Sequence, residues 1–271
     1  MTDKNKELAE EIKNLSKTDN YSIKIIEEEP EIFESKIGGT AYWTPDLAYP
    51  VNSEGKKLFL LAQINFEKEK TESPLPTSGL LQFFTGDDDA MGLNFDNLTE
   101  QANFRVVYHE NIDYKMTKES VKEYDISDSK NQEFFPIYGE YKISLNKSVD
   151  YANPSDIRFN NFFSIAYKNI YGKELKEGEN MYNVLNNEER AELEHELETD
   201  SLRHKMLGYS YFTQEDPRED EKYADYDTLL LQIDSEGEYV SWDCGIGNFF
   251  INKKALLEKD FSKVLFNWDS S

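Results

Sequence analysis

The sequence predicts an α+β fold that is rich in β-structure and built from two internally duplicated sheet halves with flanking helices. Gly39 begins the segment Gly-Thr-Ala-Tyr-Trp-Thr, and Gly208 begins the similar segment Gly-Tyr-Ser-Tyr-Phe-Thr. Gln63 and Gln232 each stand in an apolar strand pattern, 24 residues after these two glycines. A third block, a glycine-led apolar strand, follows in both copies at residues 79–84 and 245–250. Three matched blocks in one order indicate an ancient duplication whose period is too long for a solenoid.

We expect a single domain over residues 1–271, with repeat halves at roughly 36–110 and 205–271 and an inserted segment at 111–200. A chain of 271 residues is long enough to bury one large core. The 17 Tyr, 17 Phe and 3 Trp residues supply apolar surface for that core. The polar composition therefore indicates a polar exterior and not a disordered chain.

The charge and the absence of long apolar segments exclude several classes of function. With 54 acidic and 30 basic side chains, the formal net charge is -24, which opposes binding to nucleic acid or to an anionic bilayer. No segment approaches the roughly 20 apolar residues of a membrane span, and the first residues lack a signal peptide's apolar core. Cys244 is the single cysteine and cannot form an internal disulfide. These features predict a cytoplasmic protein without nucleic-acid or membrane partners.

The first part of the chain reads as one helix followed by strands. Leu8, Ile12 and Leu15 form an apolar stripe that predicts a helix over residues 5–18, and alternation predicts a strand at Tyr21–Ile26. The remaining predicted strands of the two copies share apolar runs bounded by turn residues. They are residues 57–66, 79–85 and 104–108 in the first copy, and residues 228–234, 245–250 and 264–266 in the second.

The inserted segment predicts one strand and two helices. Residues 137–145 alternate as a half-buried strand does. Asn153 is the expected N-cap of the next helix, which carries an aromatic stripe and stops at Gly172. Asn187 is the expected cap of a second, strongly acidic helix. We expect the aromatic stripe to pack into a core and not to bind a cofactor.

Two loops resemble ligand-binding motifs but lack essential parts. Gly38 and Gly39 are followed by an aromatic, proline-bearing loop and not by the helix that a phosphate-binding loop needs. An EF-hand that starts at Asp87 would need an oxygen ligand and a glutamate where Met91 and Leu98 stand. The sequence therefore favours two structural turns at these places.

Two further motifs lack the partners that their chemistry requires. Glu192 and His195 form a single Glu-x-x-His, whereas a di-iron site needs a second one and further carboxylates. Cys244 would need a neighbouring base to act as a nucleophile, and the matched position of the first copy holds Ser78. A turn that needs only a small side chain explains both Cys244 and Ser78. We therefore assign no catalytic residue, and we expect no metal and no cofactor.

The repeated polar residues form the candidate ligand-binding set. A buried glutamine must find hydrogen-bond partners. In the structural interpretation, each glutamine satisfies backbone groups of the neighbouring glycine-aromatic turn. In the functional interpretation, both glutamines face a cleft between the two halves and orient a small ligand. The alternation of side chains along the strands fits either interpretation. The candidate ligand-binding residues are Gly39, Tyr42, Gln63, Asn65, Tyr211, Gln232 and Asp234.

In combination, eight segments resemble the bacterial YwqG-like family, a domain of unknown function. They are Lys36–Gly39, Leu60–Asn65, Gly79–Phe84, Leu207–Tyr209, Gln214–Arg218, Leu229–Asp234, Asp243–Gly245 and Asn248–Phe250. The resemblance covers the chain from about Lys36 to its end. This chain has Ala41 and Tyr49-Pro50 where the family often has proline and Trp-Pro. The resemblance implies a β-rich α+β fold in a cytosolic bacterial protein, and it transfers no activity and no catalytic residue.

Two hypotheses for the function follow. The first is a non-enzymatic, acidic protein-binding factor, immunity-like or regulatory, whose partner is a basic protein. The alternative is a small-ligand-binding protein or an enzyme with its site in the cleft between the duplicated halves. The sequence leaves the oligomeric state and the identity of any ligand open.

Overall fold

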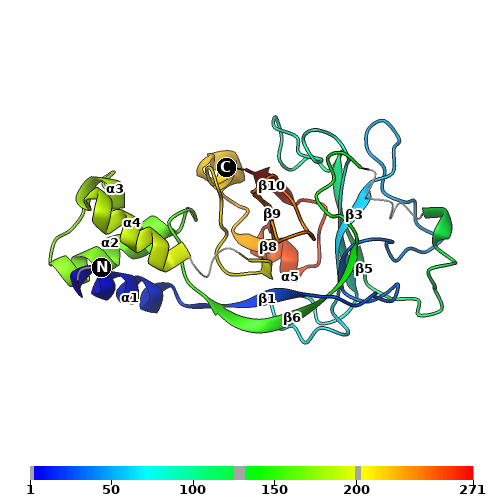
Figure 1. Cartoon of the computed structure of the whole chain (residues 1–271), viewed down its shortest axis with the longest axis horizontal. Helices are drawn as coiled ribbons and strands as arrows, with labels where there is room; N and C mark the ends of the chain where they lie inside the picture. The colour runs from blue at the N-terminus through cyan, green and yellow to red at the C-terminus, as the bar shows by residue number, and fades with distance from the viewer. Residues whose placement is uncertain (1–2, 125–131, 199–202, 271) are drawn as a thin grey trace.

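The protein consists of a lobe of helices at one end and a large antiparallel sheet that curls into a nearly closed barrel at the other (Figure 1). The computed structural model describes residues 3–124, 132–198 and 203–270. In these residues the strand order is β10-β9-β8-β7-β1-β6-β2-β3-β4-β5. The predicted β-rich fold with flanking helices is therefore confirmed.

The strands run in chain order as follows: β1 (Thr18–Ile26), β2 (Lys36–Gly38), β3 (Phe59–Asn65), β4 (Leu80–Thr85), β5 (Phe104–His109), β6 (Glu140–Asp150), β7 (Lys205–Met206), β8 (Thr228–Asp234), β9 (Ile246–Ile251) and β10 (Leu265–Asp269). The α-helices are α1 (Asp3–Ser16), α2 (Phe159–Tyr171), α3 (Met181–Val184), α4 (Asn187–Glu198) and α5 (Lys253–Leu257). Among the described helices, none has both the length and the apolar character needed to cross a bilayer.

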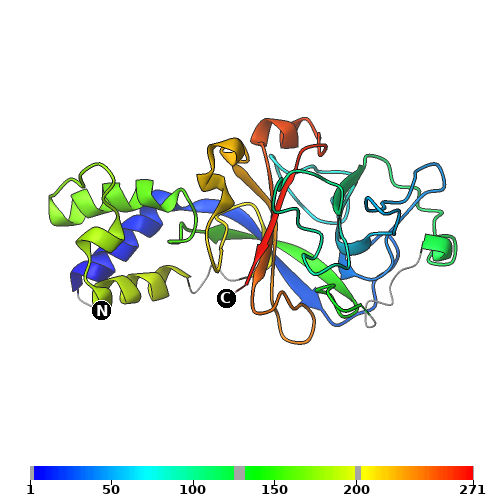
Figure 2. The same cartoon turned by 90° about the horizontal axis from the view of Figure 1, so that it is seen from above.

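Strands β1 and β6 form the centre of the sheet. They pair antiparallel along the whole of β1, from Thr18 opposite Asp150 to Ile26 opposite Lys142. Figures 1 and 2 show this two-stranded ribbon running from the helical lobe through the sheet. Outward from β6 lie β2, β3, β4 and β5, and outward from β1 lie β7, β8, β9 and β10. The central ribbon is therefore flanked by two groups of four consecutive strands.

Aromatic side chains join the two ends of the curled sheet. The ring of Phe83 on β4 lies 4.9 Å from that of Phe249 on β9, and the rings of Phe104 and Phe266 are 5.3 Å apart. The backbone N–H of Phe266 donates to the carbonyl oxygen of Leu98 at 2.9 Å. Because both sheet groups bury their aromatic residues against each other, they share one core.

The helical lobe has a core of its own. Leu8 and Ile12 of α1 pack with Phe159 and Phe163 of α2, and all four side chains are buried. The aromatic stripe predicted for α2 is thus core packing. The stripe predicted for α1 is shorter than expected, since Leu15 is 38% exposed. Helix α1 ends at Ser16, two residues before the expected end, and β1 begins at Thr18, three residues before the expected start.

The expected start of α2 is wrong. The helix begins at Phe159 with Arg158 as its N-cap, and not directly after Asn153. Asn153 instead donates from its side-chain nitrogen to the carbonyl oxygen of Ser210 at 2.9 Å, which ties this turn to the loop after β7. The expected stop is confirmed, because Gly172 adopts the left-handed conformation and its N–H donates to the carbonyl oxygen of Lys168.

The expected cap of α4 is off by one residue. The side-chain oxygen of Asn186 accepts hydrogen bonds from the backbone N–H groups of Glu188 and Glu189, both at 3.0 Å. Asn186 is therefore the capping residue, and Asn187 belongs to the helix.

Candidate functional site

Gln63 uses all of its hydrogen-bonding capacity within the chain. Its side-chain oxygen accepts from the backbone N–H of Tyr42 at 3.0 Å and from the amide of Gln82 at 2.9 Å. Its side-chain nitrogen donates to the carbonyl oxygens of Ile32 at 2.9 Å and Glu34 at 2.8 Å. Gln63 is fully buried, so these bonds satisfy an amide that has no access to water.

Gln232 makes a matching set of bonds. Its side-chain oxygen accepts from the backbone N–H of Tyr211 at 2.8 Å. On the neighbouring strand, Asn248 donates to the carbonyl oxygen of Tyr211 at 2.8 Å, as Gln82 does to that of Tyr42 at 2.8 Å. These are the hydrogen bonds that the structural interpretation of the two glutamines predicts.

The seven candidate residues lie in two separate local networks. Gln63 on β3 and Gln232 on β8 are separated in the sheet by β2, β6, β1 and β7. The side chain of Asn65 donates to the carbonyl oxygen of Phe33 at 2.7 Å, and the N–H of Asp234 donates to Nδ1 of His204 at 2.9 Å. Gly39 adopts a φ of +72° against the side chain of Glu140. A role in ligand binding stays a prediction for this set.

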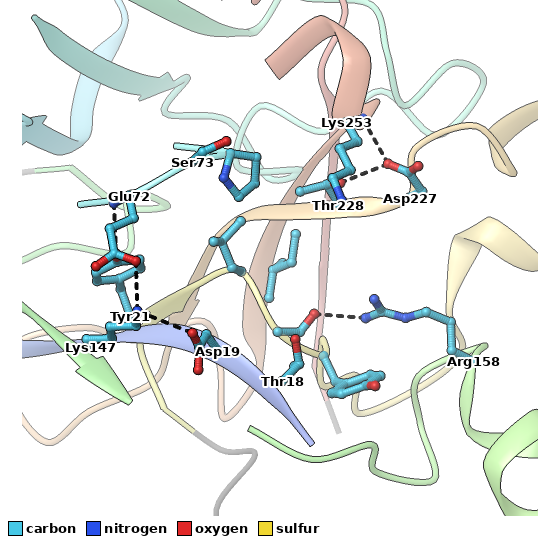
Figure 3. Close-up of a pocket in the computed structure, with 15 residues that line it drawn as sticks. Thr18, Asp19, Tyr21, Glu72, Ser73, Lys147, Arg158, Asp227, Thr228 and Lys253 are labelled. Carbon is cyan, nitrogen blue, oxygen red and sulfur yellow. Dashed lines mark hydrogen bonds and ion pairs between the residues drawn. The ribbon is translucent and has the colours of Figure 1, made fainter. Parts of the chain in front are cut away.

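A different group of residues lines a cleft of about 420 Å³ at the base of the helical lobe (Figure 3). Its walls come from both strand groups and from the central ribbon. They comprise the start of β1, the loop at residues 72–74, the end of β6, Arg158, the turn at residues 207–209, residues 227–229 and Lys253. In Figure 3, Arg158 lies on one side of the cleft, and Glu72 and Lys147 lie on the other.

Arg158 is held in one orientation by three kinds of contact. Its Nε and Nη2 atoms donate to the two carboxylate oxygens of Asp156, both at 2.7 Å. Nη2 also donates to the carbonyl oxygen of Gly208 at 2.9 Å. The guanidinium carbon lies 4.3 Å from the ring centroid of Tyr209. A fork bound to a carboxylate and stacked on a ring loses little entropy when it binds a ligand.

Asp156 connects Arg158 to a second arginine. Arg218 donates from Nη2 to Asp156 at 3.2 Å and to the hydroxyl of Ser210 at 2.9 Å, and from Nε to Asp216 at 2.9 Å. Burial acts to raise the pKa of Asp156, but the hydrogen bonds and charge of Arg158, with Arg218, hold this pKa well below its usual range. Two arginines and two aspartates therefore compensate one another's charge beneath the cleft.

Asp150 fixes the turn that forms one wall of the cleft. One carboxylate oxygen of Asp150 accepts from Nζ of Lys205 at 2.8 Å and from the backbone N–H of Tyr209 at 2.9 Å. Burial lowers the pKa of Lys205, and the charge of Asp150 opposes this shift. Gly208 has a φ of +81°, and a Cβ atom there would lie 2.2 Å from the same oxygen. This position therefore requires glycine.

The charged side chains at the cleft differ in how they are paired. Lys147 lies 3.3 Å from Asp19 and 2.8 Å from Glu72, so its charge is compensated. The backbone N–H of Lys253 donates to Asp227 at 2.9 Å. Within the described part of the chain, the ammonium group of Lys253 makes no ion pair. Lys253 is therefore a cation of this cleft that can turn toward an incoming anion. Arg158 is fixed by Asp156 and can offer an anion only Nη1, for which the described part of the chain provides no hydrogen-bond partner.

The sequence analysis missed Arg158 as a candidate residue, although the chain carries a signal for it. The tripeptide Asp-x-Arg occurs at Asp156–Arg158 and again at Asp216–Arg218. In both, the carboxylate binds the guanidinium two residues later, with Nε–oxygen distances of 2.7 and 2.9 Å. The tripeptide alone is common, so only the fold reveals that the two copies meet.

The fold and this cleft define a β-rich α+β protein with a polar, ligand-sized hollow between two groups of strands. Residues 35–270 match the family described as "Domain of unknown function (DUF1963)", and the chain belongs to that family. No curated protein matches the chain.

Proposed function

We propose that this protein binds a small polar ligand in the cleft of Arg158, and that the ligand carries an anionic group such as a carboxylate or a phosphate. The observation that carries the proposal is the guanidinium of Arg158, which is fixed by Asp156 and Tyr209 at the wall of the cleft. Because Nε and Nη2 are bound to Asp156, the guanidinium offers an incoming carboxylate or phosphate the N–H bonds of Nη1, in a fixed direction.

The local charge and shape support the same conclusion. Although the chain has a formal net charge of -24, the three acids that line this cleft are accompanied by Lys147 and Lys253, and by Arg158, whose charge is compensated by Asp156 beneath the cleft. Leu207 and Leu229 add apolar surface. The volume of about 420 Å³ falls within the range of roughly 300–1,000 Å³ that small-molecule sites occupy.

We infer further that the two strand groups arose by duplication, as the three matched blocks of sequence indicate. In support, the strand pairing has an irregular register at the same distance before each buried glutamine. The irregularity lies between Leu60 and Ala62 in the first group and between Leu229 and Leu231 in the second. Lys36 and Lys205 are both buried and paired with a carboxylate. On this inference the cleft lies between the halves at residues 36–110 and 205–271, with residues 111–200 as the insertion.

A second candidate function is the binding of a basic protein partner in a regulatory or immunity-like role. The observation that favours it is helix α4, whose 12 residues, NEERAELEHELE, include six glutamates and one arginine. Such a helix face attracts a basic partner in a salt-dependent way. Glu188→Lys combined with Glu196→Lys should weaken that association, whereas the control Glu258→Lys, at the C-cap of α5, should leave it unchanged.

Thermal melts against a panel of carboxylates and phosphates test the cleft proposal. A ligand at 100 times its dissociation constant adds roughly 2.7 kcal/mol, which is a shift of several degrees for a chain of this size. Lys253→Gln should reduce the shift. Lys254→Gln, the next residue on α5 but outside the cleft, is the matched control and should retain it. If no compound in the panel raises the melting temperature, the result contradicts the cleft proposal and favours the binding of a basic protein partner.

A further inference from the structure

A second cleft, of about 480 Å³, lies beside strand β5, in the strand group that contains β2 to β5. It is formed by Tyr42, by residues 44–47 and by residues 108–113, which continue from the end of β5. His109 is the last residue of β5, and its side chain is only 5% exposed. None of the residues that line the cleft of Arg158 takes part in this one, so the two clefts are independent sites.

The hydrogen-bond network of Gln63 and Gln82 fixes the tautomer of His109. Both N–H bonds of the Gln82 amide are used, one toward the carbonyl oxygen of Tyr42 at 2.8 Å and one toward Gln63 at 2.9 Å. Its oxygen therefore faces Nε2 of His109, at 2.8 Å, as an acceptor. Nε2 must carry a proton, and Nδ1 is then the ring atom with a lone pair.

The imidazole is held rigidly and in its neutral form. Its ring makes edge contacts with Tyr42 and Trp43, with centroid distances of 5.1 and 5.2 Å. Burial lowers the pKa of His109 to about 4, although the charge of Asp46 opposes this shift. Among the described residues, Nδ1 has no hydrogen-bond partner. The buried glutamine network thus holds His109, which lines the cleft, in one orientation and with Nδ1 as the acceptor of its ring.

The rim of this cleft is acidic. Asp46, Glu110 and Asp113 line it together with the aromatic rings of Tyr42 and Tyr108. Glu110 is partly compensated by Lys259 at 3.7 Å, but no ion pair compensates Asp46 or Asp113 in the residues that the structure describes. Carboxylates and aromatic rings around a neutral acceptor form an environment that favours a cation with hydrogen-bond donors.

The geometry points to a binding site for a primary ammonium group, which donates one hydrogen bond to Nδ1 of His109 while Asp46 and Asp113 compensate its charge. An ammonium group has three donors and no acceptor, so it matches Nδ1 of His109 and the carboxylates of Asp46 and Asp113. An anion would meet three carboxylates here. The same chemistry is available from a free alkyl amine and from the side chain of a lysine in a protein.

Titration of the protein with 1,4-diaminobutane, followed by NMR of the imidazole nitrogens, tests the proposal. We expect a saturable shift of the His109 signals, with Nδ1 affected more than Nε2, while His195 and His204 stay unchanged. The uncharged analogue 1,4-butanediol should give no shift. A second titration, with Nα-acetyl-lysine N-methylamide, tells the two sources apart: tighter binding than the diamine indicates a lysine side chain, and weaker binding a free amine.

The variant Asp46→Asn removes one rim charge at an exposed position and should leave the fold intact. We expect it to weaken diamine binding about two- to fivefold, the range of a single exposed ion pair. Asp96→Asn, an exposed acid outside this cleft, should not weaken it. The proposal is wrong if the diamine leaves the His109 signals unchanged at millimolar concentration, if butanediol shifts them equally, or if both variants bind like the wild type.

Discussion

Arg158 lies over the ring of Tyr209, with its guanidinium carbon 4.3 Å from the ring centroid, while the same guanidinium binds Asp156 through two hydrogen bonds of 2.7 Å. Residues from the helical lobe and from the sheet thus meet at one point. This contact joins the start of α2 to the turn after β7, and it gives the cleft a cation of fixed direction. The proposed ligand binding depends on that direction.

Arg158→Lys should abolish most of the ligand response. A lysine keeps the positive charge but has a single nitrogen, so it cannot hold both oxygens of Asp156 in the guanidinium geometry and also direct a fixed N–H group at an incoming anion. We also expect a loss of about 1.5–3 kcal/mol in unfolding free energy, the range of hydrogen bonds to charged groups. Denaturant unfolding and ligand-induced melting shifts measure the two effects. An unchanged ligand shift in a folded variant would show that Arg158 does not bind the ligand.

Gly208→Ala should destabilise the protein and distort the cleft. The added Cβ atom would lie 2.2 Å from a carboxylate oxygen of Asp150, and the φ of +81° is unfavourable for any side chain. Gly178→Ala is the matched control, since Gly178 has a φ of +80° and open space around it. The control should lose about 1–2 kcal/mol from the backbone conformation alone. If the two variants have the same melting temperature, the contact with Asp150 does not restrict residue 208.

Gln63→Ala and Gln232→Ala should each lower the unfolding free energy, by about 1–3 kcal/mol for every buried group left unpaired. Gln63 should cost more, because its four hydrogen bonds all end on buried or part-buried partners. Gln214→Ala, which removes one exposed bond to Ser270, is the control. Stable variants that lose a ligand response would favour the functional interpretation of the two glutamines instead.

His109 should make the stability depend on pH between about 6.5 and 4. Burial lowers its pKa to about 4 in the folded state, from an ordinary value of 6.5. As the pH falls through this window, the unfolded chain takes up a proton that the folded chain does not. The contribution of His109 is therefore full above pH 6.5 and is lost as the pH approaches 4. Unfolding curves of the wild type and of His109→Phe should differ in slope there, and parallel slopes would contradict the assignment.

The sequence predicted the sheet better than its connections. Short apolar runs such as Leu60–Asn65 and Leu229–Asp234 predict buried strands. Both segments are buried strands in the structure, β3 and β8. Strand β6 was predicted to end at Leu145 but continues to Asp150. Its last residues are polar because the ribbon leaves the sheet and reaches the helical lobe, so alternation could not reveal them.

The candidate site could not be read from the sequence because it depends on distant segments. The pairing of Gln63 with Tyr42 followed from the repeat, since its partners are close in the chain. The contact of Asp156 with Ser210 and Arg218 joins residues more than fifty positions apart, and local patterns carry no information on it. The same contact explains why α2 starts later than its cap-like Asn153 suggests.

The most direct test of the anion-binding cleft is an NMR titration of the arginine Nε–H signals with the carboxylate or phosphate that stabilises the protein most. The account predicts a saturable shift of the Arg158 signal at the same concentrations that raise the melting temperature. The signals of Arg105 and Arg190, which lie outside the cleft, should stay in place. A raised melting temperature with an unmoved Arg158 signal would contradict it, because the ligand would then bind elsewhere.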